Sequence, residues 1–378
     1  MSTEGNVAKA GLEGIVATQS AISDVNGVQG RLVYHGYDIH DLADHATFED
    51  VIYLLWNGRL PSRTELAGLK EQLSKESSLP PSIQEIIRWI PKNAAPMDML
   101  RTVVSALSFF DPDGPDMSRD ANLRKAIRLV AKFPTIVTTF HRVRNGLEPI
   151  EPRADLSVAG NFLYTLRGGE PDDIATRTMD VAFVLHADHE LNASTFAARV
   201  TAATLSDIYS AIVSAIGALK GPLHGGANEG VIKDLIEIGS VDNVEPWLKE
   251  RLAAHAKIMG FGHRVYRTED PRATHLREMS RQLGERIGET KWYRMSRKME
   301  EVMMREKHLN PNVDFYSAST YYTLGITTDL FTPIFACSRI SGWTAHVLEQ
   351  YEHNRLIRPR AEYIGPRDLT YVPVDQRS

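Results

Sequence analysis

The chain has 378 residues, 43% of them hydrophobic and 24% charged, which is typical of a folded globular protein and excludes a disordered or fibrous one. The length favours two domains, because one hydrophobic core rarely serves so many residues. With a net charge of −5 and no lysine-rich tail, the chain gives no global electrostatic support for a nucleic-acid partner or an anionic membrane partner.

The first predicted element is a short β-hairpin region within residues 14–39, where β-branched residues alternate with Asn-Gly and other glycine turn signals. Helical patterns dominate after it. Thr47 and Asp50 form a capping-box pattern at the start of the next helix, and Gly58 is expected to end that helix. The start of the chain therefore predicts a small sheet followed by helices.

Further helices are predicted over 81–92, over 120–146 with a kink at Pro134, and across 175–221. The stretch 245–262 predicts another helix, which is expected to end in glycine. Because strand signals are scarce beyond the N-terminal region, we expect a mainly α fold.

The single cysteine, Cys337, cannot form an internal disulfide, and its apolar neighbours predict a buried thiol. The N-terminal stretch lacks a continuous apolar core of signal-peptide length, and no later stretch is long enough to span a bilayer. We therefore expect a cytoplasmic protein with no membrane association.

Four short stretches concentrate polar groups among glycine or turn residues: HADHELNAST (186–195), GPLHGGANE (221–229), GFGHRVYRTEDPR (260–272) and NPNVDFYSAS (310–319). Glycines beside a polar side chain allow another molecule to approach the backbone closely. For any one of the histidines in these stretches, a structural role and a functional role both remain open.

His224 lies just before a predicted helix start, where unpaired backbone N–H groups and the helix dipole disfavour a protonated imidazole. A neutral imidazole can donate one hydrogen bond without carrying a full charge. That property suits a group that polarises a carbonyl while an enolate forms.

His186 and His189 are three residues apart on a predicted helix, with Asp188 and Glu190 beside them, so we considered a metal site. The sequence has no His-Glu-x-x-His string and no cysteine ligands, and we expect no metal. A metal-dependent hydrolase stays as a distant alternative.

Two groups of basic residues are candidates for binding anions. The GFGHRV loop lacks the strand and the third glycine of a dinucleotide motif, but its backbone is suited to wrap a nucleotide. Guanidinium groups recognise carboxylates with two parallel hydrogen bonds, so arginines of the C-terminal third are candidates for a carboxylate site if they converge. The basic residues near the loop are Lys257, Arg264 and Arg267, and the later arginines are Arg272, Arg339 and Arg358.

Together and in this order, GPLHGGANE, MGFGHRVYRTEDPR and PNVDFYS closely resemble citrate synthase of the short dimeric bacterial and archaeal type. The resemblance extends from GLEGIVATQSAIS to RLIRPRAEYIGP. It implies a mainly α, two-domain homodimer, in which a large domain is formed by residues 1–225 and 330–378. The intervening residues, 226–329, are then a small domain that binds CoA and closes over the substrates.

The resemblance also implies the reaction, in which acetyl-CoA condenses with oxaloacetate and water to give citrate and CoA. It assigns catalytic roles to Asp314 as the base for the methyl proton, His224 as the donor to the enolate oxygen, and His263 as the group that polarises the oxaloacetate carbonyl. It assigns oxaloacetate binding to His189, Arg272, Arg339 and Arg358, the last contributed across the dimer interface. It assigns CoA binding to Lys257, Ile258, Met259, Gly260, Phe261, Gly262 and Asn312, and Arg305 is a weaker candidate for a CoA phosphate. Acetyl-CoA is then a co-substrate, and no tightly bound cofactor is implied.

The nearest alternative is 2-methylcitrate synthase, which uses propionyl-CoA with the same catalytic groups, or an enzyme that uses both acyl-CoAs. One methylene discriminates by only about 1–3 kcal/mol in an apolar pocket. Leu223 in GPLHGG favours the acetyl-CoA enzyme. A non-catalytic helical binding protein is a third hypothesis, but it gives no reason to place Asp314 and His224 around one acetyl group.

Overall fold

The computed structural model describes residues 10–12, 14–263 and 265–377. Near its start, three short strands form an antiparallel sheet in the order β1 (Ser23–Asn26), β2 (Arg31–Tyr34) and β3 (Tyr37–Asp38). Ser23 pairs with Tyr34 across the first two strands, and Val33 pairs with Asp38 across the next two. The predicted hairpin region is confirmed, with a third strand added to it.

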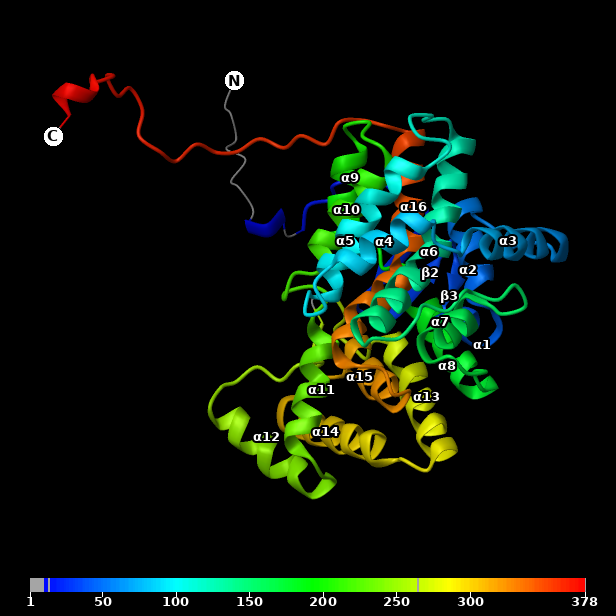
Figure 1. Ribbon diagram of the computed structural model, residues 1–378. Coiled ribbons are helices and arrows are strands. Elements are labelled where there is room, and N and C mark those ends of the chain that lie inside the picture. The colour runs from blue at the N-terminus through cyan, green and yellow to red at the C-terminus, as the bar shows by residue number, and fades with distance from the viewer. Residues whose placement is uncertain (1–9, 13, 264, 378) are drawn as a thin grey trace.

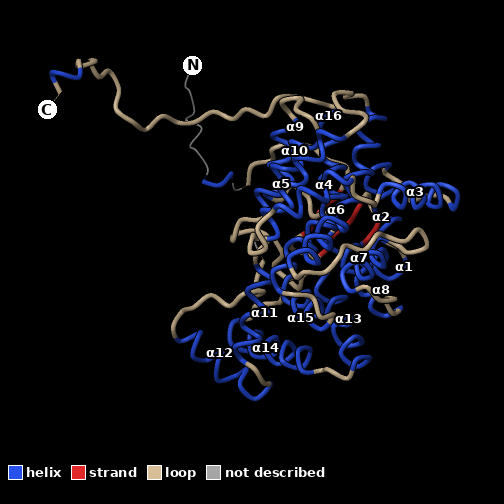
Figure 2. The backbone as a smooth tube through the Cα atoms, in the orientation of Figure 1, coloured by secondary structure: helices blue, strands red, loops and turns tan. Residues whose placement is uncertain are grey.

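Helices make up the remaining long elements, as the blue segments of Figure 2 show. The α-helices of the first half are α1 (Ile39–His45), α2 (Phe48–Asn57), α3 (Arg63–Glu76), α4 (Pro81–Trp89), α5 (Pro96–Leu107), α6 (Arg119–Arg144), α7 (Val158–Arg167) and α8 (Asp173–His186). Those of the second half are α9 (Ala193–Ala202), α10 (Ile208–Leu219), α11 (Ala227–Ile238), α12 (Val244–Ala253), α13 (Pro271–Ile287), α14 (Lys291–Lys307), α15 (Val313–Thr323) and α16 (Phe331–Glu352). Short 3₁₀ turns lie at Ala10–Leu12, Ser108–Phe110, Val241–Asn243, Thr328–Leu330 and Val374–Gln376. The predicted mainly α fold is confirmed.

The start and stop signals of α2 behave as the sequence predicts. The Thr47 hydroxyl accepts from the backbone N–H of Asp50, and the Asp50 carboxylate accepts in return from the backbone N–H of Thr47. Gly58 ends the helix at φ +73°, a conformation that glycine adopts without steric cost. Local chemistry alone therefore sets the limits of this helix.

Two of the predicted helix boundaries are wrong. The stretch 175–221 forms three helices rather than one, because the side chains of Asn192 and Asp207 cap new helix starts at α9 and α10. The helix predicted over 245–262 ends at Ala253, and the backbone of His255 turns to φ +53° just after it. The residues that follow form a loop, and the backbone of Gly260 and Gly262 in it is hydrogen-bonded to Asn310 and Asn312.

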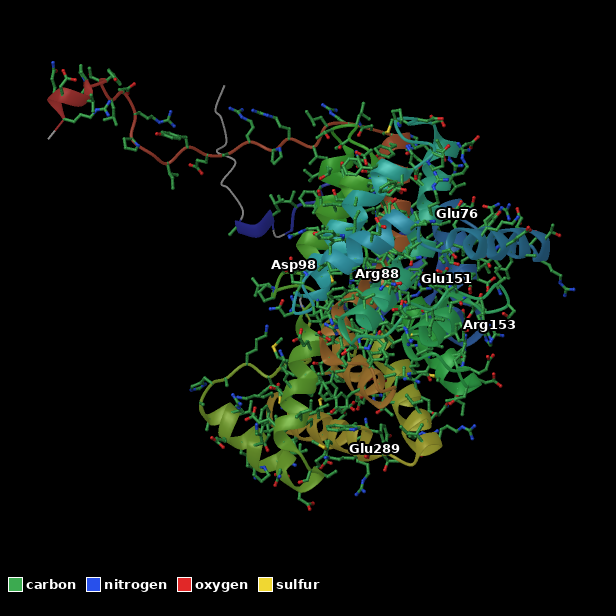
Figure 3. The ribbon with its side chains drawn as sticks, viewed as in Figure 1. Glu76, Arg88, Asp98, Glu151, Arg153 and Glu289 are labelled. Atoms are coloured by element: carbon green, nitrogen blue, oxygen red, sulfur yellow. The ribbon has the colours of Figure 1, made fainter. Side chains whose placement is uncertain are left out.

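Figure 1 shows α11, α12, α13, α14 and α15 gathered at one end of the molecule, away from the body formed by the other helices. Long helix α16 runs through that body, and its apolar side chains are buried from Phe331 to Val347. In Figure 3, Asp98 on α5 lies at the edge of this body, where its carboxylate accepts from Lys220 beyond α10 at 2.6 Å. Within the described ranges, no helix has both the length and the hydropathy that crossing a bilayer requires.

Candidate active site

His263 follows the glycine-containing loop after α12, and its ring orientation is fixed by the backbone. Its Nδ1 atom accepts from the backbone N–H groups of Val265, at 3.0 Å, and Tyr266, at 3.1 Å. An imidazole nitrogen that accepts carries no proton, so the proton of the neutral ring is on Nε2. Burial, and secondarily the positive charge of Arg272, lower the pKa of His263 to about 4. His263 is therefore a neutral Nε2–H donor.

His189 lies against His263 and Tyr266. The ring centres of the two histidines are 5.4 Å apart, and His189 Nε2 lies 3.2 Å from the Tyr266 hydroxyl oxygen. Burial, followed by the charge of Arg272, holds the pKa of His189 well below its ordinary value. These rings form one uncharged wall that presents polar atoms.

Arg272 supplies a fixed positive charge at the start of α13. Its Nε and Nη2 atoms donate to the two carboxylate oxygens of Asp270, at 2.9 and 2.8 Å, and both side chains are buried. Burial opposes the charge, but the Asp270 carboxylate raises the pKa of Arg272 above its ordinary value. Asp270 also caps α13 and accepts from the backbone N–H of Val313 at the start of α15.

Arg339 supplies a second buried positive charge from α16. Its Nε atom donates to the backbone oxygen of His186 at 2.7 Å, and its guanidinium lies 4.6 Å from the centre of the Phe335 ring. Burial lowers the pKa of Arg339 to about 10, against the opposing effect of the Asp188 carboxylate. Since the side chain is 1% exposed, a diacid that reached its outer N–H groups would meet an almost unhydrated cation.

Asp314 is the second residue of α15, after the N-cap Asn312. Burial raises the pKa of its carboxyl group to about 6, although the charges of Arg272 and Arg339 act in the opposite direction. A carboxylate with a pKa near 6 is a stronger base than an ordinary aspartate and is still ionised at neutral pH. The predicted base therefore has the electrostatic environment that this role requires.

His224 lies in the turn that precedes α11. Its Nε2 atom is 2.8 Å from the hydroxyl oxygen of Ser194, which also accepts from the indole N–H of Trp343 at 3.1 Å. Burial and the charge of Arg339 lower the pKa of His224 to about 4. The ring is therefore neutral at neutral pH, and burial is the larger of these two causes.

The stretch 257–262 forms a loop that is fixed to the residues before α15. The backbone N–H of Asn312 donates to the oxygen of Gly260 at 2.9 Å, and its side-chain amide donates to the oxygen of Gly262 at 2.9 Å. Gly260 has φ +81°, and a Cβ atom there would lie 2.6 Å from a methyl group of Val231. The predicted CoA-binding loop, from Lys257 to Gly262, is thus in direct contact with Asn312, and Ile258 and Gly260 within it are buried.

Arg358 is not brought to the other predicted site residues of its own chain. It lies in the exposed segment beyond α16 and lines a cavity of about 1130 Å³ together with N-terminal residues and the end of α16. None of the other predicted site residues lines this cavity. Figure 1 shows the C-terminal segment running away from the body of the molecule.

The alternative roles of the other polar residues receive no support from the geometry. His186 ends α8 and His189 lies in the loop beyond it, so the two are not on one helix, and His186 Nδ1 is 2.6 Å from its own helix oxygen at Ala182. Within the described ranges, no group of three or more His, Cys, Asp or Glu side chains is arranged to hold a metal ion. Arg305 is paired with Glu245, Arg267 is exposed, and Arg264 lies outside the described residues. Cys337 is buried, as expected.

The family model described as "Citrate synthase, C-terminal domain" matches residues 11–360. Citrate synthase 2 of Bacillus subtilis is 58% identical, with 97% of this chain and 99% of the relative covered. The 2-methylcitrate synthase of Shewanella oneidensis is 42% identical, with both chains fully covered.

Two solved structures agree with these relatives. The crystal structure of citrate synthase from Pyrobaculum aerophilum has a TM-score of 0.92 and 43% identity, and the match covers 97% of this chain and 95% of that one. Citrate synthase from Thermoplasma acidophilum, in a ternary complex with carboxymethyl coenzyme A and oxaloacetate, has a TM-score of 0.91 and 33% identity, covering 97% of this chain and 99% of that one.

The chain belongs to the citrate synthase family. This membership confirms the family predicted from the motifs, and with it the enzyme class and the mainly helical fold. The residue roles that the resemblance implies stay predictions, which the geometry above now makes specific.

Sequence reasoning missed several groups that hold the site of this citrate synthase together. Ser194 contacts His224 from a segment thirty residues away, and Tyr266 contacts His189 from another loop. No sequence spacing signals these tertiary contacts. The sequence does contain a signal for Asp270, because an Asp-Pro pair before a helical pattern predicts an N-cap beside Arg272.

Proposed function

We propose that the enzyme condenses acetyl-CoA with oxaloacetate and water to form citrate and CoA. The observation that carries this proposal is the fixed geometry of His263, whose Nδ1 accepts from two backbone N–H groups so that its Nε2–H is available as a donor beside His189. The pKa values of three side chains, shifted by burial in the directions that the reaction needs, support it. The pKa of the Asp314 carboxyl is raised to about 6, whereas the pKa values of His224 and His263 are lowered to about 4. At neutral pH the site therefore offers one strengthened base and two neutral donors, which is the set that enolate formation and carbonyl addition need.

The first step forms the nucleophile. Asp314 takes a proton from the methyl group of acetyl-CoA, and the charge that develops on the thioester oxygen accepts a hydrogen bond from His224. Since His224 Nε2 faces Ser194, the nitrogen left for the substrate is Nδ1. In the structure Ser194 donates its single hydroxyl proton to the Asn192 side-chain oxygen at 2.7 Å, so donation from His224 Nδ1 requires this hydroxyl to turn and donate to Nε2 instead.

The second step forms the carbon–carbon bond. The Nε2–H of His263 donates a hydrogen bond to the ketone oxygen of oxaloacetate, the enolate carbon attacks the polarised carbonyl carbon, and the same hydrogen bond stabilises the new alkoxide. The alkoxide takes up one proton from the solvent and Asp314 releases the proton that it removed, so both side chains return to their starting protonation states. Arg272, Arg339 and His189 hold the carboxylates of the diacid. Water then hydrolyses the thioester, which releases CoA and citrate.

Two further features complete the proposal. Residues 226–329 form the small domain, whose closure excludes water until condensation is complete, and the loop from Lys257 to Gly262 with Asn312 binds CoA. The enzyme is a homodimer, in which Arg358 of the partner subunit reaches the oxaloacetate site. The exposed position of Arg358, away from the other arginines of its chain, supports a role across an interface.

Propionyl-CoA is the second candidate substrate, because a 2-methylcitrate synthase also aligns with the whole chain. The 58% identical relative is a citrate synthase and the 2-methylcitrate synthase is 42% identical, which favours acetyl-CoA. Leu223 in the turn before His224 favours the same substrate.

The experiment is an assay of CoA release with oxaloacetate and a panel of acyl-CoAs, on purified wild type and Asp314→Asn. We expect a higher kcat/KM with acetyl-CoA than with propionyl-CoA. We expect Asp314→Asn to lower kcat by about 10²–10⁴-fold while it leaves oxaloacetate binding intact, because only proton abstraction is lost. A higher kcat/KM with propionyl-CoA would reverse the substrate choice, and near-normal condensation by Asp314→Asn would remove Asp314 from its role.

A further inference from the structure

A buried chain of side chains runs from α9 to the loop that carries His189. Arg199 on α9 has its Nη1 atom 3.0 Å from Nδ1 of His346 on α16, and His346 Nε2 lies 3.2 Å from Oδ2 of Asp188. The three side chains are between 0 and 3% exposed. In so dry an environment each unsatisfied polar group is costly, so the direction of every hydrogen bond is constrained.

The direction of these hydrogen bonds follows from the donor inventory. A guanidinium has only donors, so Arg199 donates to His346 Nδ1, which therefore carries no proton. The ring proton is on Nε2 and is donated to Asp188. Arg199 is itself held by the carboxylate of Glu349 at 2.5 Å and by the amide oxygen of Gln350 at 3.1 Å.

Asp188 lies at the point where this chain meets the oxaloacetate site. It directly precedes His189, and its charge opposes the effect of burial on Arg339. Its Oδ2 atom also accepts from the Ser23 hydroxyl on β1, whereas Oδ1 is buried without a hydrogen-bond partner. A Cβ atom on Gly342 would lie 2.4 Å from Oδ1, so α16 packs against this carboxylate at a position where no side chain fits.

We propose that His346 is a positioning residue for oxaloacetate. Its Nε2–H holds the Asp188 carboxylate in place, and Asp188 in turn fixes the His189 loop and supplies the counter-charge that keeps Arg339 directed at the diacid. This role rests on the proposed function only in the identity of the diacid. Neither His346 nor Asp188 touches the substrate in this scheme.

The test compares two substitutions that differ in hydrogen bonding. His346→Gln keeps one donor for Asp188 and one acceptor for Arg199, whereas His346→Met keeps the bulk and loses both. We expect His346→Met to raise the KM and the calorimetric Kd for oxaloacetate about tenfold, with kcat and the KM for acetyl-CoA changed less than twofold. His346→Gln should restore the oxaloacetate KM to within about twofold of the wild type.

Thr344→Val is the matched control for a purely structural effect. Thr344 is buried two residues earlier on α16, and its hydroxyl accepts from the Trp56 indole at 2.9 Å, away from Asp188. We expect this variant to lower the unfolding temperature without raising the oxaloacetate KM. Equal increases in oxaloacetate KM for His346→Met and Thr344→Val would overturn the proposal, as would an unchanged KM in His346→Met.

Two further arms keep the result decisive. Ser23→Ala removes the other side-chain donor to Asp188, which comes from β1, and this variant replaces His346→Met in the test if His346→Met does not fold. We expect Ser23→Ala to raise the oxaloacetate KM as well. In that case an unchanged oxaloacetate KM overturns the proposal. A wild type that binds oxaloacetate by calorimetry but forms no citrate would refute the proposed function, while the Kd values of the two His346 variants would still decide this inference. A wild type that binds no oxaloacetate overturns both.

Discussion

The two histidine turns of the site hold their imidazoles in different ways. His263 accepts from two backbone N–H groups, of Val265 and Tyr266, so its tautomer is fixed by the path of the main chain. His224 instead meets the side-chain hydroxyl of Ser194, which can donate or accept. The backbone therefore determines which nitrogen of His263 carries the proton, whereas a single hydroxyl rotor determines it for His224.

This difference matches the demands of the two proposed steps. His263 must present Nε2–H to a ketone oxygen and to the alkoxide that forms there, and the two backbone N–H groups that donate to Nδ1 keep the ring proton on Nε2. His224 needs only to donate to an enolate oxygen and to remain neutral. A hydroxyl that changes its donor direction is sufficient for that purpose, with the Trp343 N–H fixing the position of the Ser194 oxygen.

Of the two histidines, His263 is expected to show the larger effect. The side-chain nitrogen of glutamine reaches about as far as Nε2, whereas that of asparagine reaches only about as far as Nδ1. We expect His263→Asn to lower kcat about 10²–10³-fold, the usual cost of removing a donor to a developing oxyanion, and His263→Gln to lower it distinctly less. Steady-state kinetics with acetyl-CoA and oxaloacetate measure both values.

The same pair of substitutions also tests the assigned tautomer. Circular dichroism and unfolding temperatures should show that both His263 variants are folded, because the side chain is only half-buried. If asparagine preserved activity better than glutamine, the proton would have to reside on Nδ1, and the backbone contacts to that atom would have been misassigned.

A smaller effect is expected at His224, because its partner rather than the donor itself is removed. Ser194→Ala leaves His224 Nε2 and the Trp343 N–H without their shared hydroxyl. We expect kcat to fall about tenfold, since an intramolecular hydrogen bond of this kind contributes about 0.5–1.5 kcal/mol. The KM for oxaloacetate should change little, in contrast to its change in the His346 variants.

Ser214→Ala is the matched control for Ser194→Ala. Ser214 on α10 also makes a hydroxyl–hydroxyl contact, with Thr201 at 2.8 Å, but it contacts no residue of the proposed site. Wild-type kcat in Ser194→Ala, at a stability equal to that of Ser214→Ala, would show that the Nε2 partner of His224 has no part in catalysis.

The sequence predicts the fold best where local chemistry decides it. The Thr47 and Asp50 capping box and the Gly58 stop act within one helix, and both were read correctly. The break between α8 and α9 was missed, although Asn192 is a clear cap, because the apolar periodicity continues across it. Where the apolar periodicity and the capping residue disagreed, the prediction followed the periodicity and therefore missed the helix boundary.

The site was predictable only as a set of residue types. Glycine and histidine motifs identified His224, His263 and Asp314 through a family resemblance, but no local signal showed which nitrogen of each imidazole is free. That property depends on Ser194 and on the backbone beyond His263, which tertiary folding brings into contact. Local sequence patterns also could not predict where Arg339 and Arg358 lie relative to the rest of the site.

The smallest expected effect is a pH dependence that separates the base from both histidines. Burial raises the pKa of Asp314 to about 6 and lowers the pKa values of His224 and His263 to about 4. Asp314 must be ionised to accept a proton, so kcat/KM for acetyl-CoA should fall as the pH drops through about 6, to about half its plateau value at that pH. His224 and His263 stay neutral between pH 5 and 8, so they add no further inflection to the pH dependence of kcat/KM. The acid limb measured between pH 5 and 8 should therefore persist unchanged in Ser194→Ala, which removes a partner of His224 and of Trp343 and leaves Asp314 unchanged. A limb that moved with this substitution would assign the titration to His224 and contradict the burial-raised pKa of Asp314.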